Sequence, residues 1–212
     1  RNFYHHVTHS RASSVHAAEK YQLSDGRLDL GGHLPRLAQR YQYVGTLAEG
    51  ISAQVIQADD AFRYGKRVGI KVIKRQFTEC ALQEVSTMRC INALDVDDRF
   101  HLGRLLDSFS FQGNMCLVLE RLHTRLSDVH IDAPLMSDKR GILMSLVRKV
   151  AIQLFTTFAF LDTHDYVHAD LKPDNILLRC PWQHRGTYSV PIKVIDLGNA
   201  FRVSQANAFY DD

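Results

Sequence analysis

The first 40 residues and the rest of the chain differ in their pattern of hydrophobic and polar positions. Residues 1–40 are polar and irregular, and no period is sustained over them. From Tyr41 onward, short runs rich in β-branched and aromatic residues occur at about 41–47, 53–58 and 67–74, with turn-like residues between them. The pattern predicts a poorly ordered N-terminal extension followed by three β-strands.

A helix and a hairpin are predicted next. Apolar residues recur at helical spacing over 78–92 and predict a helix there: Leu82, Val85, Met88 and Ile91. Two further strand-like runs, at about 102–111 and 115–122, flank Gln112-Gly113-Asn114, which is typical of a tight hairpin turn. The order is therefore strands, one helix, and a hairpin.

After Leu122 the pattern becomes helical. A helix is predicted over 142–164, with one broad apolar face made of Leu146, Val147, Val150, Ala151, Leu154, Phe155, Phe158 and Leu161. We interpret this face as part of the hydrophobic core. The helix leads directly to the polar run that begins near His168.

Composition narrows the class of protein. A chain of 212 residues can bury a core, and its 45% hydrophobic and 23% charged residues are ordinary for a soluble domain. A net charge of +3 without a dense Lys/Arg run argues against a nucleic-acid partner. No uninterrupted apolar stretch is long enough to cross a bilayer, so no membrane partner is expected. The oligomeric state is not indicated.

Cysteines and histidines offer two weak metal candidates. Cys80, Cys90, Cys116 and Cys180 lie far apart with no Cys-x-x-Cys spacing, which favours free thiols over disulfides or zinc. His5, His6, His9 and His16 lie in the polar N-terminal segment, where we favour a solvated or disordered segment over a metal site. The free thiols, and the lack of a signal-peptide pattern, predict a nuclear or cytoplasmic location.

The most informative run is Tyr-Val-His-Ala-Asp-Leu-Lys-Pro-Asp-Asn-Ile-Leu-Leu at 166–178. It contains Asp170 and Asn175 five positions apart, with Lys172 between them. An apolar run then leads to Val-Ile-Asp-Leu-Gly at 194–198, which supplies Asp196. Each residue alone is typical of a turn or a helix cap, but the ordered set is not explained in that way.

These motifs resemble the catalytic loop and metal-binding turn of protein kinases, with Leu197 in place of the usual Phe. The resemblance implies an α+β, two-lobed fold with a β-rich small lobe, one main helix and a helical large lobe. We therefore predict a small lobe over 41–122 and a partial large lobe over 123–212, after the extension at 1–40. The resemblance stops inside the activation segment, which predicts that the chain is C-terminally incomplete.

The resemblance also implies roles for two residues of the small lobe. Lys71 closes Val68-Gly69-Ile70-Lys71, similar to the strand whose Lys holds the α- and β-phosphates of ATP. A buried ammonium needs a carboxylate partner to remain charged. Glu84 and Glu79 are both candidates, and we favour Glu84 because Glu79 lies at the start of the predicted helix.

In the catalytic loop, the resemblance makes Asp170 the residue that orients the acceptor hydroxyl and accepts its proton. It makes Lys172 the residue that neutralises the transferring phosphate. Asn175 and Asp196 would coordinate Mg²⁺, because hard oxygen atoms are the ligands that this ion prefers.

The expected nucleotide site has one irregular part. Kinases carry Gly-x-Gly-x-x-Gly-x-Val over the phosphates, whereas this chain has Ala48-Glu49-Gly50-Ile51-Ser52-Ala53-Gln54-Val55, with two alanines replacing glycines. Alanine permits less backbone freedom than glycine, so nucleotide affinity is in question. Leu119 would gate the back of the adenine pocket. The resemblance implies that its other residues are Leu47, Val55, Gly69, Glu120, Arg121, Leu122 and Leu177, and that Gly50 of the phosphate loop and Lys71 complete the nucleotide site.

The subfamily resemblance rests on the loop as well. Lys172-Pro173 is typical of Ser/Thr kinases, and Ala169 replaces the Arg that commonly holds a phosphorylated activation segment. Asp-Leu-Gly-Asn-Ala at 196–200 is similar to SR-protein kinases and to dual-specificity DYRK- and CLK-type kinases of the CMGC group, and within that set most similar to the SR-protein kinases.

Three functions are compatible with these motifs. The first is an ATP- and Mg²⁺-dependent kinase for Ser/Thr hydroxyls of proteins, with dual specificity for Tyr as a variant. The second is a catalytically impaired kinase-like scaffold, suggested by the altered glycine loop. The third is a small-molecule phosphotransferase, which Lys172-Pro173 and the predicted small lobe disfavour. We expect the first, because every polar residue that the chemistry requires is present.

Overall fold

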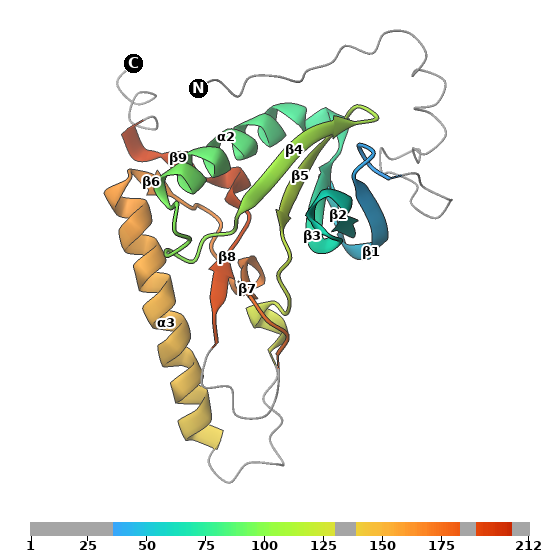
Figure 1. Cartoon of the computed structure of the whole chain (residues 1–212). Helices are drawn as coiled ribbons and strands as arrows, with labels where there is room; N and C mark the ends of the chain where they lie inside the picture. The colour runs from blue at the N-terminus through green and yellow to red at the C-terminus, as the bar shows by residue number, and fades with distance from the viewer. Residues whose placement is uncertain (1–35, 130–138, 183–189, 205–212) are drawn as a thin grey trace.

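The computed structural model describes residues 36–129, 139–182 and 190–204, with the helical backbone alone over 139–143. An antiparallel five-stranded sheet and helix α2 (Thr78–Leu94) form one lobe, and the long helix α3 (Lys139–Thr163) extends away from it beside short strands (Figure 1). The sheet has the order β1-β2-β3-β5-β4 and consists of β1 (Tyr41–Glu49), β2 (Ala53–Asp60), β3 (Lys66–Ile73), β4 (Leu105–Phe111) and β5 (Asn114–Glu120).

Four short strands form two pairs in the second lobe. β7 (Ile176–Leu178) pairs with β8 (Ile192–Val194), and β6 (Tyr166–Val167) pairs with β9 (Phe201–Arg202), both antiparallel. The catalytic-loop motif lies between β6 and β7, and Asp196 follows β8. The predicted α+β, two-lobed architecture is confirmed.

The alternation of side chains along β3 decides which residues face α2. Ile70 and Val72 join a buried cluster on one face of the sheet, together with Leu37, Tyr41, Ile56, Ala58, Val68, Cys116 and Val118. Lys71 and Ile73 point to the opposite face, because successive side chains in a strand alternate. On that side the buried residues of α2 recur at helical spacing: Ala81, Glu84, Val85, Met88 and Ile91.

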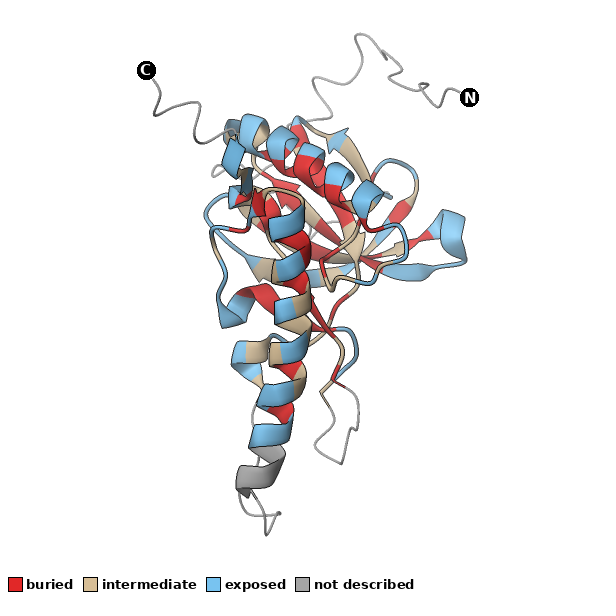
Figure 2. Cartoon of the chain, turned by 90° about the vertical axis from the view of Figure 1, so that its left-hand side faces the viewer, coloured by how far each residue is buried: buried red, intermediate tan, exposed pale blue. Residues whose placement is uncertain are grey.

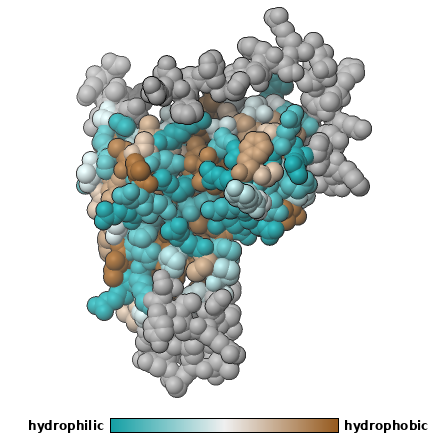
Figure 3. All heavy atoms as spheres, viewed as in Figure 1, coloured by the Kyte–Doolittle hydropathy of each residue, from teal (hydrophilic) through white to brown (hydrophobic). Residues whose placement is uncertain are grey.

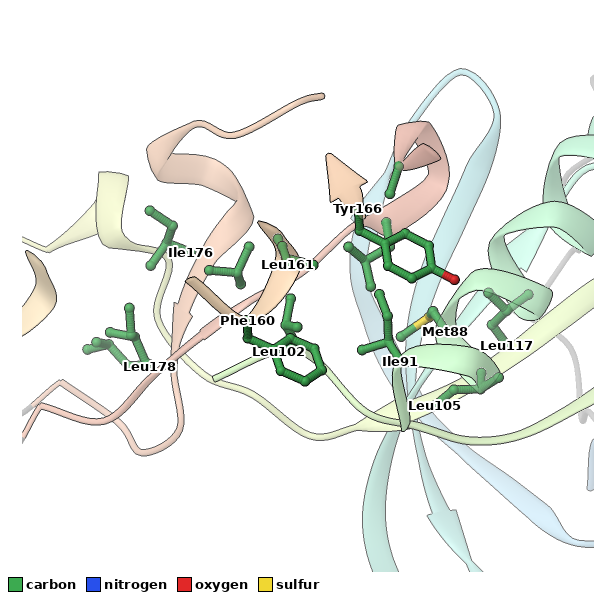
Figure 4. Close-up of a cluster of buried hydrophobic side chains, with 14 of the residues drawn as sticks. Met88, Ile91, Leu102, Leu105, Leu117, Phe160, Leu161, Tyr166, Ile176 and Leu178 are labelled. Atoms are coloured by element: carbon green, nitrogen blue, oxygen red, sulfur yellow. The ribbon is translucent and has the colours of Figure 1, made fainter. Parts of the chain in front are cut away.

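A larger core cluster joins the two lobes. Met88 and Ile91 of α2 and Leu117 of β5 belong to the same cluster as Phe160 and Tyr166 of the second lobe (Figure 4). Continuous packing of this kind fixes the small lobe on the large one, so that residues from both can define one site.

Three boundaries differ from the sequence predictions. The small lobe begins before Tyr41, because Leu37 is fully buried and its amide and carbonyl both bond Tyr41. Residues 36–40 therefore belong to the small lobe and not to the predicted extension at 1–40. Residues 1–35, which include the four histidines, lie outside the described residues. The strand predicted from 102 begins at Leu105, because Leu102 instead pairs with Val194 of β8. The strand predicted to reach 122 ends at Glu120.

The predicted apolar faces of both helices need correction as well. Leu82 is half exposed, and in α3 Val147 and Phe155 are exposed at 51% and 70%. The inner edge of α3 is instead formed by Leu146, Val150, Thr157, Phe160 and Leu161 (Figure 2). Met144–Thr163 is long and apolar enough to cross a membrane by length and composition alone. Because its inner edge packs in the core cluster, we interpret α3 as a core helix.

The described surface in the view of Figure 3 is mainly hydrophilic, with scattered apolar patches.

In the small lobe, Arg40 donates from Nε and Nη2 to both carboxylate oxygens of Asp60, at 2.7 and 2.6 Å. Asp60 is buried and also accepts from the amide of Phe62. The hydrogen bond from Arg40 outweighs burial and lowers the pKa of Asp60.

We expect Asp60→Asn to lower the free energy of unfolding by about 3 kcal/mol at pH 7, because it leaves Arg40 without its buried partner. The folded-state pKa is depressed, so the contribution of Asp60 is present above the unfolded-state pKa and is lost as pH falls through the folded-state pKa. Urea unfolding at pH 7 and near pH 3 measures this. Asp59→Asn, which removes an exposed pair with Arg67, is the control and should cost about 0.5 kcal/mol or less. An equal Asp60→Asn loss at both pH values would contradict the account.

Candidate active site

Lys71 lies at the centre of a charged triad at the junction of the lobes. Its Nζ donates to Oε1 and Oε2 of Glu84 at 2.8 and 2.9 Å, and to Oδ1 of Asp196 at 2.9 Å. Lys71 and Glu84 meet because they occupy the facing sides of β3 and α2. The partner of Lys71 is thus Glu84 and not Glu79, as the helical position of each residue predicted.

The triad is partly buried, which sets its protonation. Burial alone lowers the pKa of Lys71, but the charges of Glu84 and Asp196 raise it overall, so the ammonium stays charged at neutral pH. Burial, together with the charge of Asp196, raises the pKa of Glu84 overall, although Lys71 lowers it. Asp196 is 42% exposed, so the triad has one carboxylate open to the solvent side.

The catalytic loop is held by a second set of bonds. The amide nitrogen Nδ2 of Asn175 donates to the backbone oxygen of Asp170 at 2.8 Å and to its Oδ2 at 3.1 Å. Lys172 Nζ also donates to Asp170 Oδ2, at 2.8 Å. These three residues, which the sequence places within six positions, therefore converge on one carboxylate.

Asp170 is a carboxylate at neutral pH. The hydrogen bond from Lys172 is the main cause of the lowered pKa of Asp170, and the same bond raises the pKa of Lys172. An ionised, solvent-accessible carboxylate can accept a hydrogen bond and a proton from a hydroxyl.

His168 fixes the loop against the segment that follows β8 and carries Asp196. Its Nδ1 accepts the amide of Asp170 at 3.3 Å, so the proton is assigned to Nε2, which donates to the carbonyl oxygen of Ile195 at 3.0 Å. The amide of Ile195 in turn donates to the carbonyl of Asn175. The two predicted metal-binding residues, Asn175 and Asp196, are thus held by one bonded frame.

Two residues of the site have left-handed backbones. Ala169 has φ 61° and Asp196 has φ 64°, a conformation that costs residues with a Cβ of order 1 kcal/mol. Ala169 directly precedes Asp170, and Asp196 itself carries one of the carboxylates of the site. We interpret the strain as part of how the fold aims Asp170 and Asp196.

A largely apolar cavity lies next to the triad, between β1 to β3 and the segment after β5. Of the residues predicted for the adenine pocket, the cavity is lined by Leu47, Val55, Gly69, Leu119, Glu120, Arg121, Leu122 and Leu177. Gly50, predicted for the phosphate loop, lines the adjoining cavity under the β1–β2 turn, and Lys71 lines both cavities. The role of these residues in binding a nucleotide stays a prediction.

The cavity also has lining residues that sequence reasoning missed: Met88, Gly103, Arg104 and Ile195. A Cβ on Gly103 would lie 3.1 Å from Cγ2 of Ile195, so a larger residue there would require a small shift of that side chain. No local motif marks Gly103, Arg104 and Ile195, since they lie beside the contact of Leu102 with Val194, which are more than 90 positions apart. Met88 reaches the cavity from α2.

The β1–β2 turn, which covers the adjoining cavity, has a backbone conformation that alanine can adopt. The amide of Gly50 donates to the carbonyl of Ala53 at 2.8 Å, and Ala48 pairs with Val55. None of residues 48–53 has a positive φ, so this backbone can be adopted by alanine. Lys71, Glu84 and Asp196 line the floor of the same cavity.

The donor set fits one class of metal ion. Among the described residues, no three His, Cys, Asp or Glu side chains cluster as a metal site. Asp196 lines the cavity together with Lys71, and the amide oxygen of Asn175, whose backbone carbonyl accepts from Ile195, is a second hard oxygen donor in the same bonded frame. Mg²⁺ suits such a site, because it is commonly bound by one or two protein oxygens together with substrate phosphates and water.

An apolar pocket that leads to a fixed ammonium, two oxygen donors and an accessible carboxylate is the arrangement used for phosphoryl transfer from a nucleotide. On a two-lobed α+β fold, it defines the class of protein kinases. The chain belongs to this family, because residues 41–211 match the protein kinase domain.

Relatives are similar over most of the chain. Human "Dual specificity protein kinase CLK2" is 32% identical over 190 residues, which cover 81% of this chain and 37% of that protein. "Serine/threonine-protein kinase ppk15" of Schizosaccharomyces pombe is 36% identical and covers 76% and 29%. The chain thus spans 37% of the length of the first of these relatives and 29% of the second. The predicted resemblance to CMGC dual-specificity kinases is confirmed, whereas the closer likeness to SR-protein kinases stays a prediction.

Proposed function

We propose that this chain supplies the nucleotide site and catalytic loop of an ATP- and Mg²⁺-dependent protein kinase that acts on Ser/Thr hydroxyls. The observation that carries the proposal is the joint placement of Lys71, Glu84 and Asp196 beside the Asp170–Lys172–Asn175 group. The names of the relatives, which include both serine/threonine and dual specificity protein kinases, support the class of acceptor.

In the proposed reaction, Lys71 holds the phosphates, and Asp196 and Asn175 hold the metal ion, which supplies neutralising charge when bound. Asp170 orients the acceptor hydroxyl and accepts its proton, while Lys172 neutralises the transferring group. Glu84 keeps Lys71 extended and charged. The contacts of Lys71 with Glu84 and of Lys172 with Asp170 support these roles.

We further propose that the chain works as part of a longer protein. The relatives are longer, and α3 exposes several apolar side chains on its outer side: Met144, Val147, Ile152 and Phe155. Such side chains are suited to further packing. A nuclear or cytoplasmic location remains a prediction from the sequence.

The acceptor class is tested by incubating the full-length natural protein with γ-labelled ATP, Mg²⁺ and three acceptors: Ser/Thr peptides, Tyr peptides and small alcohols. We expect label on Ser/Thr peptides. Label on small alcohols alone would overturn the proposal. Label on Tyr peptides as well would establish dual specificity.

A kinase-like scaffold is the second candidate, and the two alanines of the phosphate loop favour it. The ordinary backbone at Ala48 and Ala53 argues that the loop is intact. We therefore expect Ala48→Gly with Ala53→Gly to change the Kd of Mg·ATP less than about threefold, and to cost about 0.5–1 kcal/mol of stability per glycine. Calorimetry and urea unfolding measure both. A gain of tenfold or more in affinity would show that the alanines impair the site.

A further inference from the structure

Lys193 is fully buried, although it is a lysine in the middle of a strand. Ile192 and Val194 on either side of it are also buried, so β8 is enclosed on both faces. A buried ammonium is retained only where partners compensate for its lost hydration. The identity of those partners shows what Lys193 holds in place.

The ammonium has two hydrogen-bond acceptors and one further ion-pair contact, and all three groups belong to the small lobe or its connections. Nζ bonds Oδ1 of Asp98, donates to the carbonyl of Leu102 at 2.8 Å, and lies 3.4 Å from Oε1 of Glu120. Asp98 and Leu102 belong to the segment between α2 and β4, whereas Glu120 ends β5. Lys193 thus joins β8 to two separate parts of the small lobe.

Both the backbone and the side chain of Glu120 form hydrogen bonds with Arg104. Its amide donates to the carbonyl of Arg104 at 3.1 Å, and its Oε1 accepts the amide of Arg104 at 3.0 Å. Glu120 and Arg104 both line the apolar cavity. Lys193 approaches the same Oε1 of Glu120 that accepts the hydrogen bond from the amide of Arg104. The ammonium therefore stabilises the negative charge of the Glu120 carboxylate, which strengthens that hydrogen bond.

Lys193 is also placed beneath the cavity by its own strand. It lies directly opposite Leu177 in the β7–β8 pair, and Leu177 lines the cavity. Directly opposite residues in an antiparallel pair have side chains on the same face of the sheet. One lysine is therefore adjacent to the cavity floor and forms an ion pair with Glu120 at the cavity edge.

We propose that Lys193 is a positioning residue for the base-binding end of the nucleotide site, acting through Glu120. The inference rests on the proposed function, and assigns to Lys193 the alignment of the Glu120 backbone with the pocket floor at Leu177. Lys193 does not line the cavity and would not touch the nucleotide. A substitution of Lys193 should therefore weaken binding of the base and leave the contacts with the phosphates unchanged.

The test measures the binding of two ligands to the full-length protein by calorimetry: adenosine, and the non-hydrolysable nucleotide AMP-PNP with Mg²⁺. We expect Lys193→Met to weaken both by the same factor, about tenfold, because a misplaced pocket edge affects the base that both ligands share. Lys71→Met should weaken AMP-PNP and leave adenosine within about twofold, because Lys71 faces the phosphates.

The control is Arg179→Met. Arg179 Nη2 contacts the other carboxylate oxygen of Asp98 at 3.3 Å, so its removal weakens the same charged group without touching Glu120. It should lower the melting temperature while leaving both Kd values unchanged. If Lys193→Met lowers the melting temperature alone and changes neither Kd, its role is structural and the inference is wrong.

Glu120→Gln tests the same link where Lys193→Met fails to fold. The amide oxygen of Gln can still accept from Arg104, and Lys193 keeps Asp98 and Leu102, so folding should survive. We expect both ligands to bind several-fold more weakly, and combined with Lys193→Met the loss should not increase further. Unchanged affinity in Glu120→Gln would overturn the inference. A wild-type protein that binds neither ligand would overturn the proposed function as well.

Discussion

Asp170→Asn should abolish most phosphoryl transfer while leaving nucleotide binding intact. We expect the rate of transfer to fall about 10²–10⁴-fold, because an amide cannot accept the proton of the acceptor hydroxyl. Asn can still accept the bonds from Lys172 and Asn175, so the loop should keep its shape. The comparison of steady-state transfer with the Kd of Mg·AMP-PNP separates chemistry from binding.

The matched control is Asp174→Asn in the same loop. Asp174 is exposed, and its Oδ1 accepts only a peripheral bond from Ser127 at 3.2 Å. This variant should keep wild-type transfer. More than a tenth of wild-type activity in Asp170→Asn would remove Asp170 from the role of base.

Asp196→Asn should remove the metal dependence of nucleotide binding. In the wild type we expect Mg²⁺ to tighten ATP binding, because an ion held by Asp196 would neutralise the charge of the phosphates. The substitution removes the carboxylate charge but leaves Lys71 paired with Glu84, so the small lobe should remain folded. Transfer should fall about 10²–10³-fold, as for the loss of other charge-stabilising groups.

The measurement is a Mg²⁺ titration of ATP affinity in the wild type and in Asp196→Asn, followed by calorimetry. We expect the wild-type affinity to rise with Mg²⁺ and the variant affinity to stay nearly constant. Asp174→Asn serves again as the control and should follow the wild type. An Asp196→Asn protein that keeps the full response to Mg²⁺ would show that the metal is held elsewhere.

Local patterns predicted the parts of the site that depend on local structure. The position of Glu84 inside the predicted helix, and not at its start, favoured it over Glu79 as the partner of Lys71, whereas the role of Lys71 came from the resemblance to kinases. The spacing of Asp170, Lys172 and Asn175 within one loop is likewise a local property. These residues converge in the structure as their positions in the sequence predicted.

Contacts between distant segments could not be predicted in the same way. Lys193 is a charged residue in an apolar run, and its partner Asp98 lies 95 positions earlier. Leu102 leaves its predicted strand because it pairs with β8. Helix α3 is apolar on more than one side, so periodicity alone could not choose between Phe155, which is exposed, and Phe160, which is buried.

The most direct test of the central claim is the transfer of labelled γ-phosphate by the full-length wild-type protein to a mixed peptide library, with Mg²⁺ and with excess EDTA. The account predicts label on peptide hydroxyls that accumulates over many turnovers with Mg²⁺ and is lost with EDTA. Wild-type labelling no greater than that of Asp170→Asn would contradict the account, and would assign this fold and its charged residues to a scaffold.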